Sequence, residues 1–304
     1  MKLINKATAA ALPVVPKPVV GYFSQRYIAG SALTDAVEEV RRLNARGMLA
    51  TIDVLGESIR RIGEAQKPVE EYLKVLDAIR EEKLSANISV KPTQLGLMLD
   101  YDKCLENYST LCAKANEFGN FVRIDMEDAT TTDATFKLYR DLKEKYADNV
   151  GVVVQAYLRR TIDDIVKLTD DLEGVNFRIC KGIYVESRKI AWKDRDIIRK
   201  NFEWLLKEAL TRGAYVGIAT HDEWLVWAAM KIIRRMGLSK DKYEFQMLLG
   251  VQPELRQIIV DAGHRLRVYV PFGEDWYPYS TRRLRENPEM AGHIMKAMFS
   301  PPRR

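Results

Sequence analysis

Residues 150–180 read VGVVVQAYLRRTIDDIVKLTDDLEGVNFRIC and contain the unit that repeats along the chain. Two short apolar runs rich in β-branched residues, 150–155 and 175–180, predict strands, and the charged stretch between them is typical of a helix. Six further runs predict strands at 48–53, 86–91, 121–126, 214–220, 243–248 and 265–270. Eight strand–helix units predict an α/β fold, a TIM-type (βα)8 barrel, which typically takes about 250 residues.

The stretch 69–84, VEEYLKVLDAIREEKL, shows the helical half of the unit. Its apolar residues recur at spacings of three and four, which places them on one face of a helix. They are Val69, Tyr72, Leu73, Leu76 and Ile79.

Two domains are expected: an N-terminal helical arm over 1–46 and a catalytic barrel over 47–304. An open doubly wound sheet is the alternative architecture. It is disfavoured because the chain has neither a Gly-x-Gly-x-x-Gly turn nor a Gly-x-x-x-x-Gly-Lys loop. A nucleotide cofactor would therefore be held without a Rossmann or P-loop element.

The composition sets limits on partners. Lys and Arg number 48 and Asp and Glu 42, a net charge of +6, which permits contact with anions or a membrane surface but does not require nucleic acid. The three cysteines form no C-x-x-C pair, which fits a cytoplasmic protein. The acidic run 125–128 has no histidine at ligand spacing, so no metal site is expected.

Polar side chains gather where the predicted strands end, the place where (βα)8 barrels carry their function. Those at the strand ends are Asp53, Glu57, Lys91, Asp125, Glu127, Asp128, Gln155, Arg178, Lys181, Gly182, Tyr184, Thr220, His221, Gln246 and Tyr269. Arg282 and Arg283, after the last predicted strand, join Lys91, Arg178 and Lys181 as cations, and Asp53, Glu57 and Asp125 can pair with some of these five. Buried cations need partners. This balance predicts an anionic ligand.

A short helix is predicted over 279–287, between Pro278 and Pro288. One of its faces carries Tyr279, Arg282, Arg283 and Glu286 at positions i, i+3, i+4 and i+7. Because a guanidinium fork matches the two oxygens of a carboxylate, we expect the paired arginines to hold a small carboxylate substrate. Leu248, Tyr269 and Tyr279 would supply an apolar wall.

Six segments, taken in order, resemble proline dehydrogenase in its single-function bacterial form. They are VKPTQLG (90–96), RIDMED (123–128), RICKGIYVE (178–186), ATHDE (219–223), YEFQMLLG (243–250) and YVPFGEDWYPYSTRRLRENPE (269–289). The resemblance implies a (βα)8 barrel that binds FAD and oxidises L-proline to 1-pyrroline-5-carboxylate, the first step of proline catabolism. Hydride would pass from proline C5 to flavin N5, and electrons to a membrane quinone. The net charge of +6 and the N-terminal arm fit a peripheral contact with the inner membrane. A separate pyrroline-5-carboxylate (aldehyde) dehydrogenase would oxidise the product.

The resemblance also implies residue roles. Arg282 and Arg283 would bind the proline carboxylate with Lys91 as a further cation. Asp125 would pair with Lys91, and Arg178 would lie at the flavin N5 edge as the second catalytic residue. Glu57 would close over the substrate by pairing with Arg282. The residues expected around the substrate ring are Tyr184, Leu248, Tyr269 and Tyr279. Those expected to hold FAD are Met126, Gln155, Arg178, Lys181, Gly182, Ile183, Tyr184, Thr220 and His221.

Two other functions remain open from the residues alone. Lys91 or Lys181 at a strand end could form a Schiff base, which is the chemistry of a barrel aldolase. A basic scaffold that binds nucleic acid is the other, supported solely by the net charge of +6.

Overall fold

The computed structural model describes residues 26–56 and 58–286, the last five of them by backbone alone. Eight parallel strands close into a barrel in the order of the sequence, with β1 paired to both β2 and β8. The strands are β1 (Leu49–Val54), β2 (Ala86–Val90), β3 (Val122–Ile124), β4 (Val150–Gln155), β5 (Asn176–Cys180), β6 (Tyr215–Ala219), β7 (Tyr243–Leu248) and β8 (Leu266–Phe272). The predicted (βα)8 barrel is confirmed, and every predicted strand is present.

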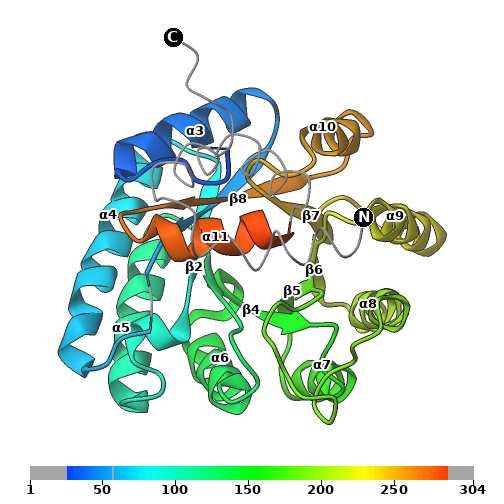
Figure 1. Cartoon of the computed structure of the whole chain (residues 1–304), viewed down its shortest axis with the longest axis horizontal. Coiled ribbons are helices and arrows are strands. Elements are labelled where there is room, and N and C mark those ends of the chain that lie inside the picture. The colour runs from blue at the N-terminus through cyan, green and yellow to red at the C-terminus, as the bar shows by residue number, and fades with distance from the viewer. Residues whose placement is uncertain (1–25, 57, 287–304) are drawn as a thin grey trace, which may run out of the picture.

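Seven helices follow the first seven strands and surround the barrel (Figure 1). They are α4 (Gln66–Glu81), α5 (Tyr101–Asn116), α6 (Thr132–Tyr146), α7 (Thr161–Asp171), α8 (Arg195–Thr211), α9 (Glu223–Met236) and α10 (Pro253–Asp261). Short 3-10 turns lie at η2 (Ile62–Ala65), η3 (Pro92–Leu95) and η4 (Ala147–Asn149). On α4, four residues of the predicted apolar face are buried and Leu73 is half-buried, because it lies at the edge of that face.

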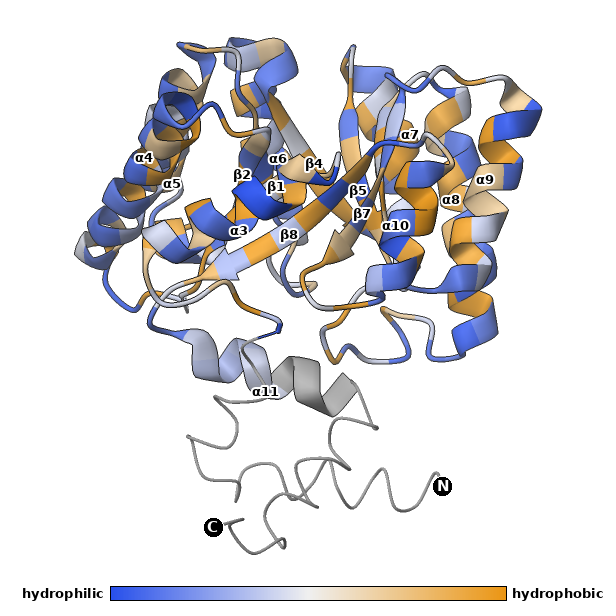
Figure 2. Cartoon of the chain, turned by 90° about the horizontal axis from the view of Figure 1, so that it is seen from above, coloured by the Kyte–Doolittle hydropathy of each residue, from blue (hydrophilic) through white to orange (hydrophobic). Residues whose placement is uncertain are grey.

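The eighth helical position is filled by a segment that precedes the barrel in sequence. Helix α3 (Leu33–Ala45) packs against β1 and β8 through Ala36, Val40 and Leu43, which are buried. It is the described part of the predicted N-terminal helical extension. The helix that follows β8, α11 (Trp276–Glu286), lies instead across the barrel end toward which the β8 arrow points (Figure 2).

Helix α11 starts earlier than the sequence suggests. The prediction that Pro278 bounds the helix was wrong, because the helix begins at Trp276 and Pro278 lies in its first turn. A proline is tolerated there, since the backbone N–H that it lacks would have no partner inside the helix. The position of α11 brings Tyr279 over the barrel mouth, where its side chain is buried.

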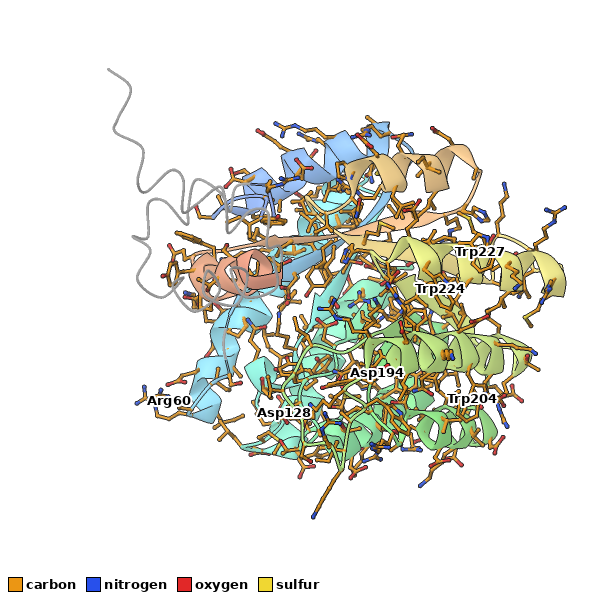
Figure 3. The ribbon with its side chains drawn as sticks, turned by 45° about the vertical axis from the view of Figure 1, so that its right-hand side comes forward. Arg60, Asp128, Asp194, Trp204, Trp224 and Trp227 are labelled. Atoms are coloured by element: carbon orange, nitrogen blue, oxygen red, sulfur yellow. The ribbon has the colours of Figure 1, made fainter. Side chains whose placement is uncertain are left out.

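The outer faces of α8 and α9 carry three exposed tryptophans, Trp204, Trp224 and Trp227 (Figure 3). The ammonium of Lys231 lies 5.0 Å from the ring centre of Trp227. Among the described residues, no helix has the length and apolar character needed to cross a membrane.

Candidate active site

A cavity of about 480 Å³ opens at the carboxyl ends of the strands, and all eight strands or the residues that directly follow them contribute to its wall. Every residue predicted to act in catalysis or to bind substrate or cofactor, and whose side chain is described, lies on this wall. These residues are Lys91, Asp125, Met126, Gln155, Arg178, Lys181, Gly182, Ile183, Tyr184, Thr220, His221, Leu248, Tyr269 and Tyr279. Of the other polar strand ends, Asp53, Glu127 and Gln246 line the cavity and Asp128 does not. The remaining three predictions, for Glu57, Arg282 and Arg283, fall on side chains outside the described part of the chain.

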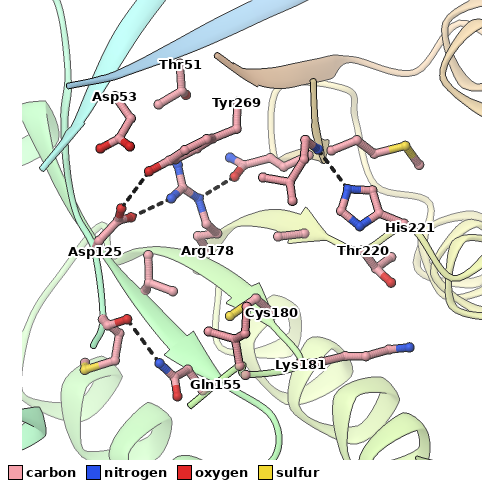
Figure 4. A pocket seen from close by; sticks show the side chains of 18 of the residues that line it. Thr51, Asp53, Asp125, Gln155, Arg178, Cys180, Lys181, Thr220, His221 and Tyr269 are labelled. Atoms are coloured by element: carbon pink, nitrogen blue, oxygen red, sulfur yellow. Dashed lines mark hydrogen bonds and ion pairs between the residues drawn. The ribbon is translucent and has the colours of Figure 1, made fainter. Parts of the chain in front are cut away.

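A buried ion pair forms the centre of the cavity wall (Figure 4). Arg178 Nη1, from β5, donates to Asp125 Oδ1 at 2.7 Å and to Ser89 Oγ at 3.0 Å. The Tyr269 hydroxyl donates to Asp125 Oδ2 at 3.1 Å, and the guanidinium carbon of Arg178 lies 5.5 Å from the Tyr269 ring centre. Because burial raises the pKa of Tyr269 well above its usual value, the phenol stays protonated and donates.

A second ion pair lies beside the first. Lys91 Nζ contacts both carboxylate oxygens of Asp53, at 2.8 and 3.1 Å, and Asp53 is fully buried on β1. The predicted pairing of Lys91 with Asp125 was therefore wrong. Arg178 reaches across the barrel interior to Asp125, which leaves Lys91 to the acid of the adjacent strand β1.

The charge state of Lys91 bears on the aldolase alternative. Although burial opposes its charge, the carboxylates of Asp53 and Asp125 raise the pKa of Lys91. A Schiff-base nucleophile must be a neutral amine, and Lys91 is held as an ammonium. Lys181 donates to Asp222, which Arg199 Nε also contacts at 2.7 Å. The aldolase alternative finds no support in these contacts.

The side of the cavity formed by β4, β6 and β7 carries neutral polar groups. Gln155 Nε2 donates to the carbonyls of Met126 and Glu127, at 3.1 and 2.9 Å. These bonds orient the amide, so that Gln155 Oε1 is a buried acceptor without a partner among the described residues. His221 Nε2 accepts the backbone N–H of Leu248 at 2.8 Å, which places the ring proton of a neutral imidazole on Nδ1.

Gly182 shapes the loop after β5. Its φ is +99°, a conformation that glycine adopts readily, and a Cβ there would lie 2.1 Å from the Tyr157 ring. The loop can therefore lie close to both Tyr157 and a bound ligand only if residue 182 has no side chain.

Replacing Gly182 with alanine is expected to weaken binding of the flavin that the family resemblance implies by about fivefold or more, because the clash with Tyr157 must displace the loop, at a cost of roughly 1–3 kcal/mol. Titration of the flavin-free protein followed by fluorescence measures the loss. Gly213→Ala is the matched control: φ there is +79° but no atom lies within 4 Å of the added Cβ. Equal flavin affinity in the two variants would contradict the steric argument.

A cavity with buried ion pairs at the carboxyl ends of eight parallel strands defines a (βα)8-barrel enzyme. The sequence model of a family described as proline dehydrogenase matches residues 36–296. The chain belongs to the proline dehydrogenase family: it is an oxidoreductase that oxidises proline, and membership of the family implies a flavin cofactor.

Several relatives support this assignment. Proline dehydrogenase 2 of Bacillus subtilis (strain 168) is 35% identical over 275 residues, which is 90% of this chain and 89% of that protein. Proline dehydrogenase of Deinococcus radiodurans is 34% identical over 280 residues, 91% of this chain and 90% of that protein. Among solved structures, proline utilization A from Bdellovibrio bacteriovorus, inactivated by N-propargylglycine, superposes with a TM-score of 0.82 at 25% identity. It aligns with 88% of this chain, which spans 32% of that longer protein.

Proposed function

We propose that the cavity binds FAD and that the chain uses it to oxidise L-proline at C5, with 1-pyrroline-5-carboxylate as the product. The observation that carries this proposal is the guanidinium of Arg178, buried in the cavity wall against Asp125. A buried guanidinium costs little reorganisation during reaction and is well suited to negative charge that develops beside it.

The described residues fit a flavin. Gln155 Oε1, a buried acceptor to which no described residue donates, suits the single ring N–H of an oxidised isoalloxazine. Gly182 allows backbone to approach closely, and the Lys181 ammonium offers donors to a phosphate. Met126, Ile183, Tyr184, Thr220 and His221 complete the proposed cofactor wall.

The protein residues position the substrate and tune the site. When bound, the flavin takes up the two electrons and the hydrogen that leave proline C5. Asp125, Ser89 and Gln246 hold Arg178 in place by hydrogen bonds of 2.6–3.0 Å. Lys91, held as an ammonium by Asp53, adds positive charge at the substrate end of the cavity.

The remaining assignments complete the substrate site. Arg282 and Arg283 would bind the proline carboxylate and so fix the direction of the C5–H bond. Holding the reacting bond in the productive direction would lower the activation barrier of the oxidation. Tyr184, Leu248, Tyr269 and Tyr279 line the cavity and would pack around the pyrrolidine ring. Glu57 would close the site by pairing with Arg282.

We place the enzyme in the cytoplasm, in peripheral contact with the inner membrane, where a quinone would accept the electrons. A separate aldehyde dehydrogenase would consume the product. Purified protein is expected to be yellow and to bleach when L-proline is added under anaerobic conditions. A colourless preparation that binds no added FAD would refute the cofactor assignment.

Tetrahydrofuran-2-carboxylate is expected to compete with L-proline and to leave the flavin oxidised. It keeps the carboxylate and the five-membered ring but has no ring nitrogen to support the oxidation. Steady-state kinetics would show a raised KM at constant kcat, and cyclopentane without a carboxylate is the matched control that should not compete. If the carboxylate compound fails to compete, the proposed anion anchor is wrong.

A further inference from the structure

Glu244 is a buried acid beneath the cavity, and it does not line the cavity itself. It lies on β7, two residues before Gln246 and on the same face of the strand. Its carboxylate receives a guanidinium fork, with Arg267 Nε at 2.6 Å from Oε1 and Nη2 at 3.1 Å from Oε2. Although burial opposes its charge, Arg267 lowers the pKa of Glu244 to about 2, so the carboxylate is ionised and can only accept hydrogen bonds.

Gln246 connects this acid to Arg178. Gln246 Nε2 donates to Glu244 Oε1 at 2.7 Å, and Gln246 Oε1 accepts from Arg178 Nε at 2.6 Å. The two ends of a side-chain amide differ, since one donates and the other accepts. Because an ionised Glu244 can only accept, the amide nitrogen must face Glu244 and the amide oxygen must face Arg178.

We infer that Glu244 is a positioning residue for proline oxidation: it anchors the Gln246 amide nitrogen, and the anchored amide oxygen in turn holds the orientation of Arg178. The inference rests on the proposed function, because it acts through the role given there to Arg178. The hydrogen-bonded series runs from Arg267 to Asp125, both of which line the cavity, and each step joins buried or nearly buried groups.

A simpler role for Glu244 would be to neutralise Arg267, with Arg265 at 3.9 Å as a weaker partner. That role makes no use of Gln246. The adjacent strand β6, however, leaves room for the Gln246 amide: a Cβ on Gly217 would lie 2.4 Å from Gln246 Nε2. The amide occupies a space that the neighbouring strand keeps open, which favours a role in orientation over charge balance alone.

Glu244→Gln tests the inference. A neutral amide at residue 244 has one acceptor end and one donor end, so it cannot accept from both the Arg267 fork and Gln246 Nε2 as the carboxylate does. The Gln246 amide therefore loses its fixed acceptor, and Arg178 loses part of its support. We expect kcat to fall about tenfold to a hundredfold, less than the loss of a preorganised donor itself would cause, because Glu244 acts on Arg178 through Gln246. KM for proline should change less than about threefold. The midpoint potential of the bound flavin should become more negative, because Arg178 no longer points its charge toward the cavity.

A second substitution should restore function. In Glu244→Gln combined with Gln246→Glu, the carboxylate at residue 246 must accept from Arg178 and the amide at residue 244 can donate to it. We expect kcat and the flavin potential of this double variant to return most of the way to the unaltered values. Asp164→Asn is the matched control, since it removes an ion-paired carboxylate on α7, 2.9 Å from Arg160 and away from the cavity, and should change neither quantity.

A Glu244→Gln variant with lowered thermal stability but unaltered kcat and flavin potential would overturn the inference and leave charge balance as the role. If Glu244→Gln does not fold, Gly217→Ala keeps Glu244 and Arg267 and displaces the Gln246 amide alone; normal kcat there would overturn the inference equally. Failure of L-proline to bleach the unaltered protein would instead refute the proposed function, and the inference with it.

Discussion

Arg178→Met is expected to reduce the rate of flavin reduction by L-proline by a factor of about a hundred or more, the scale reported for loss of a preorganised charge at a reacting centre. The guanidinium is buried in the cavity wall and is held from three sides, by Asp125, Ser89 and Gln246. Methionine fills a similar volume but supplies neither charge nor donors. Anaerobic stopped-flow absorbance with saturating proline measures the rate, and the proline concentration dependence separates it from binding.

The same change should cost stability, because it leaves Asp125 in a largely buried place without its cation. Removing one partner of a buried pair typically costs about 3–5 kcal/mol. Arg178→Lys is the informative control: it keeps the charge but cannot donate to Asp125, Ser89 and Gln246 together, so it should recover stability more than rate. A methionine variant that retains more than about a third of the unaltered rate would contradict the proposed role of Arg178.

The barrel could be predicted from the sequence because its strands are buried on both faces. Strands of that kind appear as short continuous apolar runs, as at 150–155, where every residue is buried. Polar residues that end such runs must meet at one end of the barrel, so the cavity wall was predictable as well. The family resemblance, in contrast, supplied the flavin and the substrate, which no pattern of polarity could name.

The pairing of charges within the cavity could not be predicted in the same way. Lys91 follows β2, and both neighbouring strands offer it an acid, Asp53 from β1 and Asp125 from β3. The choice depends on Arg178, whose long side chain reaches Asp125 from two strands away. That contact depends on which strands face each other across the closed barrel. The order of residues along a single strand does not reveal this.

Two positioning groups were missed although the sequence carried a signal for them. Ser89 and Glu244 interrupt apolar runs, and each lies two residues before a polar strand end, Lys91 and Gln246 respectively. Since side chains on a strand alternate between its two faces, the spacing of two places both members of each pair toward the barrel interior. Reading inward from each strand end by two residues would have found them.

Lys91→Met is expected to destabilise the folded chain by about 3–5 kcal/mol, because Asp53 would remain fully buried without its cation. The Tyr72 hydroxyl, 3.2 Å from Asp53 Oδ1, is too weak a partner to replace an ammonium. Urea unfolding followed by circular dichroism gives the free energy, and KM for proline should rise in parallel because positive charge is lost at the substrate end. Asp53→Asn combined with Lys91→Met should recover most of the stability without restoring KM.

The loss should also depend on pH in a direction set by Asp53. Burial raises the pKa of Asp53, and Lys91 is the main interaction that lowers it. In the folded variant, which lacks Lys91, the Asp53 carboxyl therefore keeps its proton to a higher pH than in the unfolded chain, where Asp53 has its ordinary pKa of 3.8. A folded pKa above the unfolded one means that stability is lost as pH rises between the two. The difference in unfolding free energy between Lys91→Met and the unaltered chain should therefore grow as the pH is raised above the unfolded pKa of 3.8. A constant difference above that pH would show that Asp53 is charged without Lys91, and a difference near zero would show that the pair contributes nothing to the fold.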